Sequence, residues 1–227
     1  MTGERVSLSE AAYRHLRGEI LACRLAPGQR LTERRLAVDT GHGISPLREA
    51  LTRLDQEGLI RTLPRKGYQV TPLTLKSIDD LFGMWLIVGP ELVRLGVARA
   101  SEEDLARARA EFAALEAAGT DSAPHFIELA ERTFRTLACA TGNDYLLGIF
   151  DRIAGDMARV WVLILDADPS APVSGSRIRI GELLDRRDAD RAAANARAYI
   201  EEAHERVLRA VIRWPSVMKT ELVALGH

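Results

Sequence analysis

Basic side chains that could bind nucleic acid are concentrated in the first third of the chain. They occur in two neighbouring segments and in a basic turn: Arg34, Arg35, Arg48, Arg53, Arg65 and Lys66. A guanidinium donates paired hydrogen bonds to a phosphate or to the O6/N7 edge of guanine, and an ammonium pairs with phosphate as a compact charge. Any one of these residues could equally belong to a solvated surface, so a DNA contact depends on the elements that hold them.

Residues for catalysis lack the necessary order and spacing. The chain has no Ser/His/Asp arrangement, no zinc-type spacing of Cys or His, and no glycine-rich loop of the kind that binds phosphates. Adjacent carboxylates at 102–104 are explained by helix capping and by the helix dipole. The histidines show no ligand spacing: His15, His42, His125, His204 and His227. The sequence therefore argues against an enzyme, an alternative that a screen for turnover of small carboxylates would test.

Two short helices are predicted before residue 41. Ser7 and Glu10 form a capping box ahead of the first, in which the hydroxyl accepts a backbone N–H and the carboxylate reaches back. Thr32 can cap the second helix, over residues 33–39. The Gly-His-Gly sequence that follows predicts a sharp turn.

A third helix and a hairpin complete this region. Ser45 before Pro46 predicts a helix start, because a capping oxygen precedes a residue whose missing N–H costs nothing there. The helix ends at Gly58, and short strands at 59–63 and 68–70 flank the basic turn. This is the pattern of a helix-turn-helix with a wing. A plain three-helix core explains the apolar positions equally well, but the basic residues lie on the elements that would face a duplex.

The rest of the chain reads as an all-helical domain. Residues 1–72 carry 12 Lys or Arg and 8 Asp or Glu, net +4, whereas the remainder is net −5, an asymmetry typical of a nucleic-acid module joined to another domain. After a linker at 71–74, six amphipathic stretches predict an antiparallel bundle. The expected fold is mostly α, with a winged helix-turn-helix at 1–70 and a helical bundle at 75–227.

Targeting signals are not evident in the sequence. The first residues lack an apolar run, and the longest strongly apolar stretch, residues 160–165, is too short to cross a bilayer. Hydrophobic residues make up 47% and charged residues 28%, which excludes a disordered or fibrous chain. We therefore expect a cytoplasmic protein with no membrane partner.

The chain resembles the GntR family of bacterial transcriptional regulators. The resemblance is carried by LAPGQRLTER at 25–34, LREAL at 47–51, LPRKG at 63–67 and ACATGN at 138–143. Within that family it is similar to the FadR subfamily, whose effector domain is a helical bundle of the FCD type. The resemblance implies a homodimer that binds double-stranded operator DNA and changes its grip when a small metabolite fills the bundle.

The resemblance assigns DNA contacts residue by residue. Arg34 matches a DNA-contacting arginine on the second helix, and Arg48 matches one on the recognition helix. Ser45 matches a hydroxyl residue at the start of the recognition helix, where the helix N-terminus can face a phosphate. The wing tip that enters the minor groove corresponds to Arg65, Lys66 and Gly67.

Ile44 is a departure from the family pattern. It stands where members usually carry an arginine that reads bases, and a lost bidentate contact costs about 1–3 kcal/mol of discrimination. Operator preference is expected to differ from the subfamily norm unless Arg35 compensates. The alternative is a helical protein-interaction module with weakened DNA reading, whose partner binding would survive alanine at Arg34 and Arg48.

A metal site is not expected, although many subfamily members hold a metal with one Asp and three His. The matching positions here are Ala130, Phe134, Arg177 and Tyr199. None of these side chains is a normal metal ligand in such a setting. We therefore predict that the protein uses no metal and no other cofactor.

A small anionic metabolite is the expected effector. The alignment directs Arg177 and Tyr199 into one cavity with Phe134, Met157 and Trp161, and one cation with one phenol in an apolar pocket suits a carboxylate. Core packing of the aromatic residues and a structural ion pair for Arg177 are the alternatives.

The first bundle helix also departs from the family. Trp85 and Gly89 replace an Arg and a Glu of many relatives, which indicates a remodelled pocket to which Trp85 contributes. The sequence thus predicts a ligand-responsive DNA-binding regulator.

Overall fold

The computed structural model of the chain describes residues 7–117, 123–167 and 180–213. Its fold is mostly helical with one small antiparallel sheet, so the predicted fold class is confirmed. The chain divides into two compact units, the first ending at Thr74 and the second beginning at Leu75. Each has its own buried core and is described by itself.

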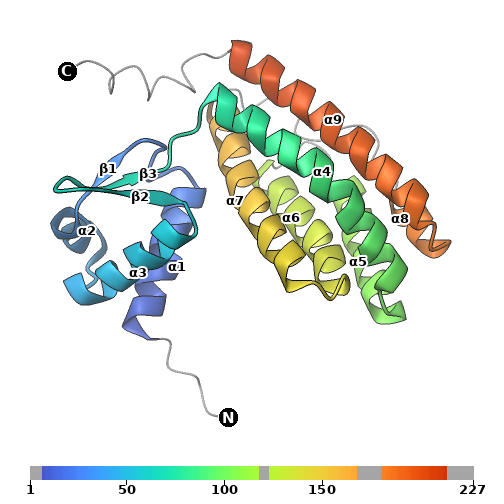
Figure 1. Cartoon of the computed structure of the whole chain (residues 1–227), viewed down its shortest axis with the longest axis horizontal. Helices are drawn as coiled ribbons and strands as arrows, with labels where there is room; N and C mark the ends of the chain where they lie inside the picture. The colour runs from blue at the N-terminus through green and yellow to red at the C-terminus, as the bar shows by residue number, and fades with distance from the viewer. Residues whose placement is uncertain (1–6, 118–122, 168–179, 214–227) are drawn as a thin grey trace. The chain divides into compact units, whose positions relative to one another are not determined.

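Three helices and a three-stranded sheet form the first unit (Figure 1). The helices are α1 (Leu8–Leu21), α2 (Glu33–Thr40) and α3 (Ile44–Gln56). The strands are β1 (Arg30–Leu31), β2 (Ile60–Leu63) and β3 (Gly67–Val70), antiparallel in the order β1-β3-β2. Apolar side chains of α1, α3 and the sheet bury one another in a single core.

Strand β1 was not predicted from the sequence. Its two residues pair with β3, Arg30 opposite Gln69 and Leu31 opposite Tyr68. Two residues are too few to show the alternation by which a strand is recognised in a sequence. The consequence is functional, because β1 leads directly into α2 and so brings the start of that helix beside the hairpin.

Local capping explains most of the helix starts. The Thr32 hydroxyl accepts the Arg35 amide at 3.3 Å, which confirms the predicted cap of α2. Ser7 likewise accepts the Glu10 amide at 3.1 Å, but the Glu10 carboxylate binds Arg14 and Arg53 instead of completing a capping box.

The predicted cap of α3 at Ser45 is wrong. Gly43 is the N-cap, and the helix begins at Ile44 with no side-chain hydrogen bond to its cap. Pro46 is tolerated there because the amides of a first helical turn have no intrahelical partner. Since the proline does not have to be the first helical residue, Ser45 lies exposed inside the first turn.

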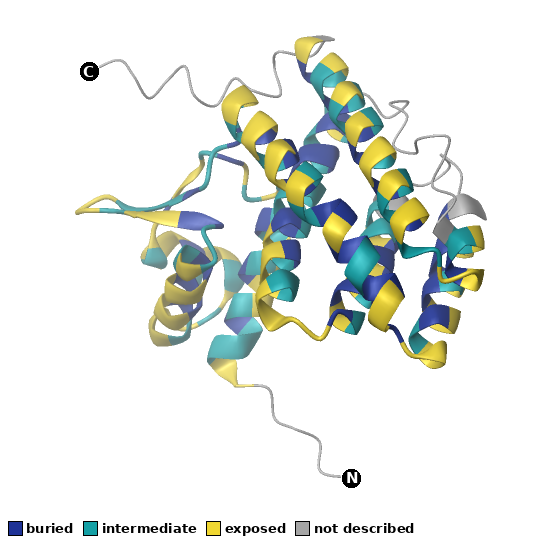
Figure 2. Ribbon diagram, turned by 45° about the vertical axis from the view of Figure 1, so that its right-hand side comes forward, coloured by how far each residue is buried: buried dark blue, intermediate teal, exposed yellow. Residues whose placement is uncertain are grey.

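Six helices form the described part of the second unit (Figure 1). They are α4 (Leu75–Arg99), α5 (Glu102–Ala117), α6 (Ala123–Ala140), α7 (Asp144–Ala167), α8 (Ile180–Asp185) and α9 (Ala189–Arg213). Helix α4 packs against α6, α7 and α9, and α5 packs against α6 and α8. Figure 2 shows buried and exposed residues alternating around these helices, as expected for amphipathic helices in a bundle.

Helix α4 is the central element of the bundle. It alone among the described helices is long and apolar enough to span a membrane, but the same length and composition are found in core helices of soluble bundles. Here its buried residues, including Leu92, Val93 and Val97, belong to the core.

Two glycines let α4 approach its neighbours closely. A Cβ atom on Gly89 would lie 2.6 Å from Ile200 Cδ1 of α9, and one on Gly96 would lie 2.6 Å from the carbonyl oxygen of Leu137 in α6. The position at which many relatives are expected to carry a Glu therefore has no room for one here without repacking.

Candidate DNA interface and effector cavity

The wing turn and the start of α2 line one shallow hollow in the first unit. Its lining residues are Thr32, Glu33, Arg34, Thr62, Leu63, Pro64, Arg65, Lys66, Gly67 and Tyr68. They meet because β3 pairs with β2 on one side and with β1, the strand that leads into α2, on the other. Arg34 is thereby brought to the same surface as Arg65 and Lys66, which lie 31 and 32 positions later in the sequence.

Three of the predicted DNA-binding residues carry an available positive charge in that hollow. Arg34, Arg65 and Lys66 are exposed, and none forms an ion pair with any residue that the structure describes. Cations without an internal partner can neutralise phosphates and release the counterions that accompany DNA. The hollow therefore has the electrostatic character that phosphate binding requires.

Arg48 differs from these three because its charge is already compensated. Its Nε and Nη2 donate to the two carboxylate oxygens of Glu33 at 3.0 and 2.8 Å, and the Tyr68 hydroxyl donates to Oε1 at 3.4 Å. The Arg48 hydrogen bonds lower the pKa of Glu33, so this carboxylate is ionised at neutral pH. Sequence reasoning missed Glu33 because the two partners are 15 residues apart.

Arg35 is also paired, at 2.8 Å from Asp39 one helical turn along α2. The pair is exposed, and such pairs contribute little to stability, so phosphate can compete for the guanidinium. Ser45 and Ile44 lie exposed in the first turn of α3. The side chain at the position of the family's base-reading arginine is therefore apolar and accessible.

The wing tip has a backbone that only particular residues tolerate. The amide of Lys66 donates to the carbonyl oxygen of Leu63 at 2.9 Å, closing the turn. Arg65 and Gly67 have positive φ angles of 62° and 85°. A Cβ atom on Gly67 would lie 2.5 Å from the carbonyl oxygen of Leu31, so glycine permits the close approach of the wing to β1.

The second unit contains a cavity of about 70 Å³ between α4, α6, α7 and α9. Five of the predicted effector-binding residues line it: Trp85, Phe134, Met157, Trp161 and Tyr199. The other lining residues are Phe82, Ile127, Ala130, Glu131, Phe150, Ile153, Ala154, Ala158 and Ala203. Arg177, the sixth predicted residue, lies outside the described residues.

Aromatic rings pack around this cavity. The Trp85 ring meets Phe134 edge to face at 5.5 Å between centroids and Phe150 at 5.8 Å. Phe134 stacks on Tyr199 at 6.1 Å. The rings come from four helices, so the cavity is a product of tertiary packing.

Polar groups are few on the described lining. Burial raises the pKa of Tyr199, which keeps its hydroxyl protonated and able to donate a hydrogen bond. Glu131 supplies a carboxylate, and no described lining residue is cationic. Arg177, the expected cation, lies outside the described residues.

The three described residues at the positions expected to match the family's metal ligands do not fit a metal ion. Ala130 and Phe134 on α6 and Tyr199 on α9 face the cavity, and none offers a customary ligand atom. Within the described ranges, no three His, Cys, Asp or Glu side chains are grouped so as to hold a metal. The chemistry of the cavity is therefore that of an aromatic pocket.

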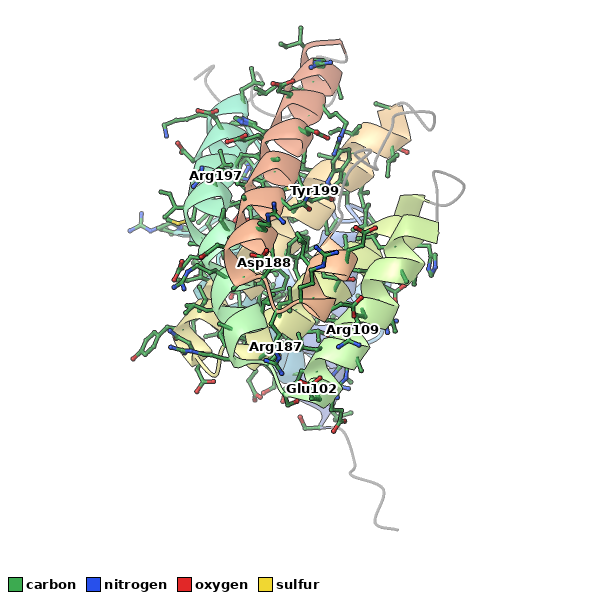
Figure 3. All side chains as sticks on the ribbon, turned by 90° about the vertical axis from the view of Figure 1, so that its right-hand side faces the viewer. Glu102, Arg109, Arg187, Asp188, Arg197 and Tyr199 are labelled. Atoms are coloured by element: carbon green, nitrogen blue, oxygen red, sulfur yellow. The ribbon has the colours of Figure 1, made fainter. Side chains whose placement is uncertain are left out.

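A separate charged cluster lies at one end of the bundle (Figure 3). Arg187 donates to Glu102 at 2.7 Å and to the Ala100 carbonyl oxygen at 3.0 Å, and Arg109 forms an ion pair with Asp185 at 3.1 Å. These charges compensate one another. The cluster ties α5 to the turn between α8 and α9 and has a structural role, whereas Tyr199 lies elsewhere on α9.

Comparison with known families identifies both units. The description "Bacterial regulatory proteins, gntR family" matches residues 8–70, and the FCD domain matches residues 80–212. These two matches correspond to the two compact units of the structure.

Individual relatives are also transcriptional regulators. The Nta operon transcriptional regulator of Aminobacter aminovorans is 29% identical over 189 residues, covering 82% of this chain and 87% of that protein. The uncharacterized HTH-type transcriptional regulator YdhC of Bacillus subtilis (strain 168) is 33% identical over 93 residues, covering 41% and 42%. The solved structure of E. coli McbR/YncC aligns with a TM-score of 0.60 at 18% identity over 96% of this chain and 99% of that one, which supports the fold.

Proposed function

Since the chain belongs to the GntR family of bacterial transcriptional regulators and carries an FCD domain, we propose that it is a cytoplasmic homodimer that binds operator DNA under the control of a small molecule. GntR regulators bind operator DNA, and FCD domains bind small-molecule effectors. The matched domains and relatives are regulators and not enzymes. A protein-interaction module without DNA binding is not favoured by these matches.

The observation that carries the DNA proposal is the hollow shared by the wing turn and α2. Arg34, Arg65 and Lys66 are exposed there and have no ionic partner among the described residues. In a winged helix-turn-helix the recognition helix, here α3, enters the major groove while the wing contacts the adjacent backbone or minor groove. Arg48 and Ser45 on α3 and Gly67 in the wing complete the proposed interface with Arg35.

Two copies are proposed because helix-turn-helix regulators read half-sites that are related by twofold symmetry. A dimer binds two half-sites about one helical turn apart, so its phosphate contacts are doubled without any new contact type. The FCD bundle is the proposed dimerisation domain.

The effector is proposed to bind in the aromatic cavity of the bundle. Its proposed class is a small organic carboxylate with an apolar part, as expected from Arg177 and Tyr199. Effector binding changes DNA affinity only if the ligand has different affinities for the DNA-competent and DNA-incompetent states of the dimer.

The DNA proposal is tested by the salt dependence of binding. A duplex from the region upstream of the gene and a random duplex are titrated by fluorescence anisotropy at several salt concentrations. We expect a log–log slope of about −0.9 for each neutralised phosphate. A double variant, Arg34→Ala with Lys66→Ala, should weaken binding to both duplexes and flatten the slope by about 2 per protomer.

The control variant is Arg24→Ala, which removes an exposed arginine paired with Glu19 at 2.7 Å outside the hollow. It should leave the slope unchanged. A wild-type slope near zero, or equal slopes for the double variant and wild type, would contradict the proposed interface.

A further inference from the structure

Arg206 on α9 has a buried guanidinium edge without an acceptor among the described residues. Its side chain is 17% exposed, and its Nε and Nη2 atoms are buried with no hydrogen-bond partner in the described part of the chain. Its ionic contact is a loose one, 3.8 Å from Nη1 to Glu202 one turn earlier. Buried donors are nearly always satisfied in folded proteins, so this edge requires an explanation.

The two unpaired atoms form the edge of the guanidinium that suits a carboxylate. Nε and Nη2 point the same way, and together they donate two parallel hydrogen bonds to two oxygens. The chain uses this edge elsewhere: Arg48 holds Glu33 at 3.0 and 2.8 Å, and Arg94 holds Glu91 at 2.8 and 2.5 Å. Arg206 presents the same donor pair without the acceptor.

Burial of the Arg206 guanidinium without an acceptor is energetically unfavourable. Burial of Nε and Nη2 reduces the solvation of the charge and lowers the pKa of Arg206, although an arginine stays protonated at neutral pH. A buried charge is stabilised when a counter-charge with matching hydrogen bonds is supplied. An anionic ligand would supply both.

Arg206 lies near the aromatic cavity of the bundle but is not one of its described lining residues. It follows Tyr199 by seven residues and Ala203 by three, and both of these residues line the cavity. Seven residues are close to two helical turns, so Tyr199 and Arg206 lie on the same face of α9. They are near enough for each to shift the pKa of the other.

We propose that Arg206 binds the carboxylate of a small organic anion whose apolar part occupies the aromatic cavity. This rests on the proposed function and deepens it by naming the cation and the ligand class. The Glu131 carboxylate on the lining would repel the acid group of the ligand. In the proposed pose the acid group therefore points toward the α9 face that carries Arg206.

The volume of the cavity limits the size of the apolar part of the ligand. Its volume is about 70 Å³, roughly half of the 150 Å³ that accommodates benzene. A short aliphatic chain of about three or four carbons fits this space without repacking. Butyrate is therefore a suitable probe, and butyramide is its neutral counterpart of the same shape.

The experiment measures butyrate binding to the full-length protein. Trp85 and Trp161 line the cavity, so intrinsic tryptophan fluorescence reports occupancy, and the shift in Tm provides a second readout. We expect butyrate to bind at about millimolar concentration, as a ligand of so few atoms allows, and butyramide at least about tenfold more weakly. Absence of any butyrate response in the wild-type protein would overturn the inference.

Variants of Arg206 separate ligand binding from a structural role. Arg206→Met should lower butyrate affinity at least about tenfold and leave butyramide affinity unchanged. Its ligand-free Tm should be equal to or above that of the wild type, because a poorly satisfied buried charge has been removed. Arg206→Lys keeps the charge but loses the paired edge, so it should also bind butyrate more weakly.

The matched control is Arg209→Met, which removes an exposed arginine that pairs with Glu205 at 2.6 Å on the same helix. It should bind butyrate as the wild type does. Unchanged butyrate affinity in both Arg206 variants, or a ligand-free Tm of Arg206→Met well below that of Arg209→Met, would overturn the inference. Salt-dependent DNA binding is measured separately, so a protein that binds DNA but not butyrate contradicts only the Arg206 proposal.

Discussion

At the scale of single residues, Glu33 controls the arginine of the recognition helix. It accepts hydrogen bonds from both Nε and Nη2 of Arg48, so in the free protein the positive charge of this guanidinium is compensated by the Glu33 carboxylate. Phosphate or guanine must share Arg48 with Glu33 or displace it. Sequence reasoning identified the arginine, while its partner became evident only when α2 and α3 were placed side by side.

The first prediction concerns Glu33→Gln. The amide removes the negative charge but preserves hydrogen-bonding capacity, so Arg48 becomes available to phosphates. Affinity for a random duplex should rise and the log–log salt slope should steepen by about 0.9 per protomer. The comparison variant is Glu19→Gln on α1, which releases Arg24 in the segment after that helix instead. Identical slopes for the two variants would show that Arg48 does not meet a phosphate.

At the scale of elements, close backbone approaches shape both units. The wing approaches β1 at Gly67, and α4 approaches α6 at Gly96. In each case a backbone carbonyl oxygen lies too close to the glycine for a Cβ atom to fit, at 2.5 Å for Gly67 and 2.6 Å for Gly96. The placement of a whole element therefore requires glycine at each of these positions. A local sequence pattern does not reveal this requirement, because the contacting residue is distant in the sequence.

The second prediction concerns the wing. Gly67→Ala puts a Cβ atom 2.5 Å from the Leu31 carbonyl oxygen at a φ angle of 85°, so it should destabilise the first unit by about 1–3 kcal/mol and weaken DNA binding. Urea unfolding and anisotropy measure the two effects. Gly18→Ala on α1 is the control, because its Cβ would meet nothing within 4 Å and should stabilise the helix. Equal stability of the two variants would contradict the tight wing contact.

The third prediction concerns the packing of α4. Gly96→Ala forces α4 away from the Leu137 backbone, so the unfolding free energy of the bundle should fall by about 1–3 kcal/mol. Gly83→Ala on the same helix is exposed with nothing within 4 Å of its Cβ and should be neutral or stabilising. Thermal unfolding followed by circular dichroism checks both. A neutral Gly96→Ala would mean that α4 and α6 are not in close contact.

At the scale of the whole molecule, two units with separate cores are joined through the residues around Thr74. In the first unit, Leu16, Leu47 and Leu51 are fully buried among residues of that unit. Because the DNA-binding unit has its own hydrophobic core, we expect it to fold without the bundle. In the proposed function, control by an effector then depends on how the bundle pairs two protomers.

The fourth prediction follows from this division. A protein made of residues 1–74 should fold cooperatively and bind DNA with a log–log salt slope about half that of the full-length protein, because the proposed dimerisation domain is missing. Circular dichroism and anisotropy provide the measurements, and full-length protein is the reference. An equal slope would argue against dimerisation through the bundle.

Sequence patterns predicted the features that depend on near neighbours. The cap at Thr32, the helical periodicity of the second unit and the basic wing turn involve residues within a few positions of one another. The same reasoning misplaced the start of α3, because Pro46 is compatible with more than one position in a first helical turn. Five aromatic and sulfur-containing side chains assigned to a common pocket do line one cavity.

By itself, then, the amino-acid sequence determined the class of fold and the location of the basic residues, since these follow from residue type and short-range periodicity. Tertiary structure decided that Glu33 neutralises Arg48, that β1 joins the hairpin, and that Arg206 has an unpaired donor edge. Such features depend on which distant side chains share a solvent-excluded space, and that is established only when the helices have packed.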